Sequence, residues 1–175
     1  MNEPHPGGKE DVNCESTDNP EKDVHINLVE SPAPWLPAKT DPSKDEKEAA
    51  RNAALCKGIV AETIPHFRPD PFEALPLRSV GKQEFPVLIS GQLFFDASHF
   101  PCEGDVPHPG GHPARGSIWE IHPITSIQVC KNKTLHRCPA EDASVWTPLH
   151  VVPAHFLAAP AAAFDREMES EPDED

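Results

Sequence analysis

The stretch Pro86–Asp96, PVLISGQLFFD, decides the fold that we expect for this chain. It is rich in β-branched and aromatic residues and carries no charge before Asp96, which predicts the strongest β-strand in the sequence. Gly91 stands in its middle, and a glycine inside a strand is typical of a β-bulge or a sharp bend. Small barrels need such a bend where a strand passes from one sheet to the other, so we expect a small barrel.

Three more segments have the pattern of strands. Asp23–Val29 alternates polar and apolar residues, Ile59–Ile64 is an apolar run that ends at a proline, and Gly116–Cys130 alternates again. Pro123 predicts a bulge or break in the last of them. The predicted class is therefore mainly β, a small OB-like, partly open barrel of four to five strands with one short helix. The alternation predicts these core residues: Val24, Ile26, Leu93, Phe95, Trp119 and Ile121.

The rest of the chain is organised around these strands. Residues 1–10 are expected to be disordered or to be the remnant of a hairpin at a Gly-Gly turn. The OB-like domain is expected over residues 11–130, and residues 31–56 insert a proline-rich linker and a short helix that begins at an S-x-x-E capping box. Residues 131–175 are predicted to be mostly disordered and to end in an acidic tail, with Val145–Leu149 packing back onto the domain.

Composition argues against several classes of protein. The formal net charge of -14 is unfavourable for binding a phosphate backbone, which requires Lys and Arg, so we do not expect a nucleic-acid partner. No apolar run approaches the ~20 residues that span a bilayer, so we expect no transmembrane segment. The first residues, MNEPHPGGKEDVNC, have neither the basic nor the apolar region of a signal peptide.

The five cysteines form no CxxC pair, which argues against a zinc knuckle and against a thioredoxin-like motif. If the protein is exported, we expect a disulfide between Cys102 and Cys130. A second use of cysteine is a metal clip in the Pro/Gly/His-rich loop, made by Cys102 with His99, His108 and His112. We favour a loop that binds no metal, because such loops often contain histidines that ligate nothing.

Histidines and carboxylates recur on the polar faces of the predicted strands. The candidate polar cluster is Asp23, His25, Asp96, His99, Glu120 and His122. Imidazoles beside carboxylates are ligands for zinc, manganese or iron, and His25, Glu120 and His122 are the metal candidates. The alternative, which we favour, is that these side chains bond to cross-strand neighbours and that Glu120 pairs with Arg68 or Arg115.

Several blocks of the sequence resemble a group of uncharacterised bacterial proteins with an OB-like domain. The blocks are Asn13-Cys14, Asp23–Ile26, Val60–Arg68, Gly91–His99 and Arg115–Ile124, of which GQLFFDASH and WEIHPI are the most specific. The resemblance implies a further strand before the Gly-Gly turn, often after a secretion signal, so this chain looks truncated at its N-terminus. It also implies that the full-length relatives are exported, and no activity comes with it.

Our first functional expectation is a non-enzymatic OB-like binding or scaffolding module, with a protein, a glycan or a small molecule as partner and with no cofactor. The alternative is a metal-dependent hydrolase or nuclease that uses a divalent metal ion held by the candidate cluster. A third is single-strand nucleic-acid binding through exposed aromatic rings, which the acidic composition argues against.

Overall fold

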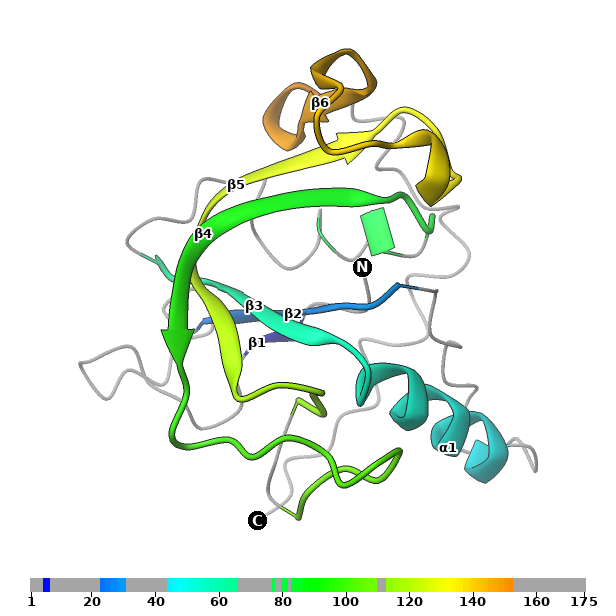
Figure 1. Ribbon diagram of the computed structural model, residues 1–175, viewed down its shortest axis with the longest axis vertical. Helices are drawn as coiled ribbons and strands as arrows, with labels where there is room; N and C mark the ends of the chain where they lie inside the picture. Colours follow the sequence, from blue (N-terminus) through cyan, green and yellow to red (C-terminus); the bar gives the residue numbers. More distant parts are fainter. Residues whose placement is uncertain are drawn as a thin grey trace.

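The computed structural model describes these residues: 5–6, 23–30, 44–65, 77, 80–81, 83–109 and 113–152. Figure 1 shows them as one curved β-sheet with a single α-helix at its side. The acidic tail and most of the predicted N-terminal disorder lie outside the described residues. Within them, no helix has the length and apolar composition needed to cross a membrane.

The elements follow the predicted ones closely. In chain order they are β1 (His5–Pro6), β2 (Val24–Leu28), α1 (Lys44–Leu55), β3 (Ile59–Thr63), β4 (Val87–Phe95), β5 (Trp119–Cys130), η4 (Leu135–Arg137), η5 (Ala143–Val145), β6 (Trp146–Pro148) and η6 (Leu149–Val151). The capping-box segment does begin a helix, and Gly58 follows its end, as a residue without a side chain often does.

The sheet order is β1-β2-β3-β5-β4. β6 also pairs with β5, at the C-terminal end of β5. β3 and β5 run parallel, whereas the other pairs are antiparallel. β4 and β5 curve together around one side of the molecule in Figure 1. A five-strand path in which β5 lies between β3 and β4 is consistent with a small, partly open OB-like barrel. The predicted mainly β class with one helix is therefore confirmed.

The bend predicted at Gly91 is present. The register between β4 and β5 shifts on both sides of Gly91, which lies opposite Ile124 and next to Pro123 of β5. A Cβ atom at this position would collide with the Ile121 side chain and with the Pro123 carbonyl oxygen. Glycine is therefore needed because the two strands approach closely there, and the proline marks a bulge in β5 without ending the strand.

The main hydrophobic core is built from β2, β3, β5, η6 and the residues between β3 and β4. Its buried residues are Val24, Ile26, Ala61, Leu77, Val80, Phe85, Ile124, Ile127, Val129 and Leu149. The predicted core positions Val24 and Ile26 belong to it, and Ile121 packs against it. Three other predictions were wrong, because the side chains of Leu93, Phe95 and Trp119 are exposed. They lie where β4 and β5 extend beyond the bulge, past the residues that fill the core.

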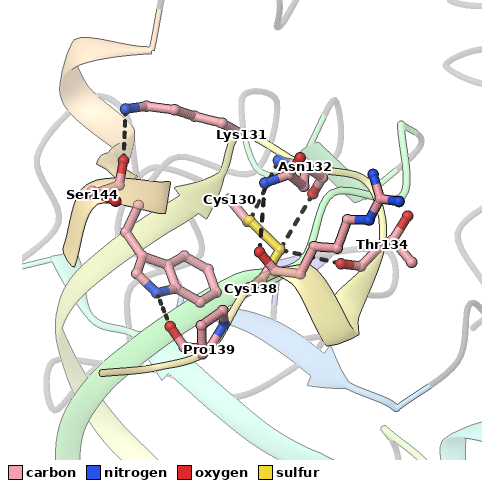
Figure 2. Close-up of a disulfide and its surroundings, with 9 residues drawn as sticks. Cys130, Lys131, Asn132, Thr134, Cys138, Pro139 and Ser144 are labelled. Atoms are coloured by element: carbon pink, nitrogen blue, oxygen red, sulfur yellow. Dashed lines mark hydrogen bonds between the residues drawn. A yellow bond between two sulfur atoms is a disulfide. The ribbon is translucent and has the colours of Figure 1, made fainter. Parts of the chain in front are cut away.

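The domain continues beyond Cys130, where the sequence predicted its end. β6 pairs with the end of β5, which confirms that Val145–Leu149 packs back, and a disulfide joins Cys130 to Cys138. Figure 2 shows this loop, in which the Trp146 indole nitrogen donates a hydrogen bond to the Pro139 carbonyl oxygen at 2.9 Å. Residues 131–152 are thus part of the folded domain.

The predicted disulfide between Cys102 and Cys130 was wrong. Cys102 is bonded to Cys56 at the end of α1, and the two Cα atoms are 5.4 Å apart. This bond ties the helix to the loop that follows β4 and excludes Cys102 as a metal ligand in that loop. Sequence spacing cannot distinguish between such pairings, because the partners are set by the fold.

Candidate functional site

β2 is buried on both faces, although its polar alternation predicted one face in solvent. Asp23, which precedes the strand, and His25 and Asn27 within it have exposed fractions of 9%, 1% and 2%. The loop before β5 covers this face, where the Asn27 side chain donates a hydrogen bond to the Ala114 carbonyl oxygen at 2.7 Å. The polar face of β2 therefore forms one wall of a buried cluster.

Glu62 of β3 stands at the centre of this cluster. It lies directly opposite His25 in the antiparallel register, and its Oε1 atom is 2.8 Å from His25 Nε2. Its Oε2 atom is 2.9 Å from Nδ1 of His122 on β5. One carboxylate thus joins two imidazoles that come from two different strands.

The contacts continue from His122 to a second pair of acids. His122 Nδ1 is 3.1 Å from Glu120 Oε1, and Arg115 Nη1 donates to Glu120 Oε2 at 2.9 Å and to Asp96 Oδ2 at 2.6 Å. His99 Nδ1 is also 2.6 Å from Asp96 Oδ2. The result is an unbroken chain of charged and hydrogen-bonding groups across β2, β3, β5 and the loop after β4.

Negative charge dominates this buried chain. The described part of the cluster contains four carboxyl groups, those of Asp23, Glu62, Asp96 and Glu120, and one permanent cation, the completely buried guanidinium of Arg115. Arg115 contacts Asp96 and Glu120. Hydrogen bonds that His122 donates to the carboxylates of Glu120 and Glu62 raise the pKa of His122 to about 10. Burial by itself would raise the pKa of Glu62, but hydrogen bonds from His122 and His25 lower it below its usual value. His122 therefore carries a positive charge at neutral pH in the metal-free protein.

The metal-free protein should lose stability as the pH rises from about 6.5 to about 10. The folded-state pKa of His122 exceeds its usual value, so its contribution is fully present below pH 6.5 and disappears as pH passes through about 10. The stabilising contribution of Glu62 depends on pH in the opposite direction. Because the pKa of Glu62 is lowered in the folded state, its contribution is fully present above pH 4.5 and is lost in acid.

The prediction is checked by measuring the midpoint of urea unfolding across this pH range in the presence of a chelator. A His122→Gln variant should lose the alkaline part of the profile, while His136→Gln, at an exposed position, should retain it. A wild-type profile that stays flat between pH 6.5 and 10 would contradict it.

Three donor groups lie close enough to hold one metal ion. Asp23, Glu62 and His122 each offer an atom within 4.8 Å of the others. Asp23 lies just before β2, Glu62 in β3 and His122 in β5. Two carboxylates and one imidazole suit zinc, manganese or iron. Such an ion would also offset the excess of buried negative charge.

This set differs from the metal ligands predicted from the sequence. His122 belongs to both sets, and Asp23, predicted to assist, is a donor. His25 and Glu120 stand outside the three-donor group and contact its members, His25 on Glu62 and Glu120 on His122. The predicted cluster does converge, because Asp96 and His99 join the same chain of contacts through Arg115.

Sequence reasoning missed Glu62 as a site residue. The available signal was its position as the one charged residue in the apolar run Ile59–Ile64. The expected pairing of Glu120 with an arginine is confirmed for Arg115, while Arg68 and His112 lie outside the described residues. His108 contacts the Pro109 carbonyl oxygen.

The chain was also compared with known proteins. No protein-family model matches it, and no curated protein or solved structure does so either. The relationship to OB-like bacterial proteins therefore stays a prediction, and function has to be argued from the site itself.

Proposed function

We propose that this protein is a non-enzymatic binding module of OB type whose buried polar cluster holds one divalent metal ion. The observation that carries the proposal is the convergence of Asp23, Glu62 and His122 within 4.8 Å. These three residues come from separate parts of the sheet, so their approach depends on the whole fold and not on a local turn.

The surroundings of the three donors support this role. His25 and Glu120 contact the donors from outside, as the supporting residues of metal sites do when they fix the orientation of a ligand. The exposed fraction is 2% for Glu120 and 4% for Glu62. Carboxylates that are this buried need a cation or hydrogen-bond donors nearby. Arg115 and His122 supply these to Glu120, and a divalent ion at the three donors would add positive charge beside Asp23 and Glu62.

The wild-type chain, stripped with a chelator, should take up about one equivalent of Zn²⁺ or Mn²⁺ in a calorimetric titration. Glu62→Gln keeps the shape of the side chain and removes its charge, so the affinity should fall at least about 100-fold, beyond the usual loss for a supporting residue. Glu103→Gln makes the same change at an exposed position and should bind like wild type.

Circular dichroism must show that each variant is folded, and His122→Gln replaces Glu62→Gln if the latter is not. A folded wild-type protein that takes up neither ion would overturn the proposal. So would a folded Glu62→Gln protein with wild-type affinity.

A metal-dependent hydrolase or nuclease is the second candidate function. Three protein ligands leave coordination positions for water, and the His122 side chain is 25% exposed, so solvent reaches one side of the site. The metal-loaded protein should then hydrolyse bis(p-nitrophenyl) phosphate or p-nitrophenyl acetate, and Glu62→Gln should not. Metal uptake without turnover leaves the binding module.

A further inference from the structure

The second half of β4 is exposed along its whole length. Every residue from Ser90 to Phe95, hereafter the β4 edge, is exposed, and three of the six are large and apolar. The exposed fractions of Leu93, Phe94 and Phe95 are 71%, 48% and 49%. Trp119 of β5, which is 47% exposed, stands beside Phe95 with the ring centroids 5.2 Å apart. Large exposed apolar side chains that gather at one site are typical of a surface that another molecule covers.

Backbone pairing at the β4 edge is also incomplete. β4 is the last strand of the sheet path, and among the described residues it pairs with β5 only. Its free side therefore presents backbone donors and acceptors to any extended chain that approaches it. Natural edge strands are protected from such pairing by charged residues or proline, yet Val87–Phe95 contains neither.

The side chains of the β4 edge point to both faces of the sheet. Phe94 lies opposite Glu120, on the face of the polar cluster, and packs on the His122 ring with the two ring centroids 5.2 Å apart. Leu93 and Phe95 lie opposite Ile121 and Trp119, on the other face. A partner that adds a strand here can cover both faces at once, whereas a ligand on one face would leave the other in water.

We propose that a second copy of this chain covers the β4 edge by antiparallel pairing of β4 with β4. The net charge of -14 on each copy opposes the association of two copies, so the contact has to come from uncharged groups. The β4 edge carries no charge, so the partner strand that matches it is extended and uncharged as well. The chain itself has such a strand in β4. A two-fold axis through the β4 edge brings the same uncharged residues together from both copies, so the contact is self-complementary.

Salt dependence follows from the same charge pattern. The contact is apolar and hydrogen-bonded, while the two acidic bodies repel each other, so added salt should strengthen the dimer by screening the repulsion. A basic peptide bound by charge attraction would instead be released by salt.

Sedimentation equilibrium or light scattering on the full chain tests the proposal. The mass should rise with protein concentration from 19.2 kDa towards twice that value, and more so in high salt. Leu93→Lys places a charge on the β4 edge at an exposed position and should keep the protein at the monomer mass. Val106 is an apolar residue outside the sheet with an exposed fraction of 66%. Val106→Lys introduces the same charge there, and this variant should dimerise like wild type.

Cross-linking tests the geometry of the contact. In a Cys14→Ser background, Leu93→Cys near the middle of the β4 edge should form a covalent dimer on mild oxidation, and Val106→Cys should not. A wild-type protein that stays at 19.2 kDa in high salt would overturn the proposal and point to another partner, such as a glycan or a different protein. Dimers that survive Leu93→Lys, or that Val106→Lys abolishes equally, would also overturn it.

Discussion

Replacing Arg115 with Met should lower the free energy of unfolding by about 3–5 kcal/mol. Arg115 is completely buried, and its Nη1 atom donates to both Asp96 and Glu120. Methionine fills a similar volume but leaves these two buried carboxylates without their shared cation. Asp96 and Glu120 keep their histidine contacts but lose the buried cation that they share, and a buried charge that loses its cation is far more costly than a missing surface pair.

Urea unfolding of Arg115→Met, with Arg137→Met as the matched control, measures this loss. Arg137 is exposed, so its replacement should change stability by no more than about 0.5 kcal/mol. Adding Glu120→Gln to Arg115→Met should recover part of the stability, because it removes one of the stranded charges. A change below about 1 kcal/mol in Arg115→Met would mean that water reaches the acids and that they are not buried in solution.

Removing the Cys56–Cys102 disulfide should cost about 4 kcal/mol, and removing Cys130–Cys138 about 2.5 kcal/mol. The two bonds join cysteines separated by 46 and 8 residues, and a longer closed loop restricts the unfolded chain more strongly. The double replacements Cys56→Ser/Cys102→Ser and Cys130→Ser/Cys138→Ser leave one bond each, so their urea midpoints compare the two contributions directly.

Equal losses, or a larger loss for the short loop, would contradict this order. Disulfides persist in oxidising compartments, so we expect the chain to reach full stability only when it folds under oxidising conditions.

The periodicity of the sequence was sufficient to predict most of the fold. Alternation identified the main strands, Gly91 and Pro123 identified the bulge, and the capping box identified the helix, because each of these signals acts over a few residues. Burial of the β4–β5 end was predicted wrongly for Leu93 and Phe95, since alternation shows which residues share a face but not whether another element covers that face.

The candidate site was predictable in part for the same reason. Strand phase placed Glu120 and His122 on one face, and the structure brings them together. The role of Glu62 depended on which strand pairs with β5, and that pairing is set by the complete fold. The cysteine pairs could not be predicted for the same reason. Cys56 and Cys102 lie close together only when α1 packs against the loop that follows β4.

The parallel pairing of β3 with β5 also determines when the site can form as the chain folds. The two strands meet at Ala61 and Ile121, with the whole of β4 lying between them along the chain. Such non-local pairing closes a long loop and forms slowly. Glu62 and His122 flank these two residues, so they come together only in that step. A nascent chain that has not yet emerged as far as β5 therefore has no site, and metal uptake would mark the moment at which the barrel is complete.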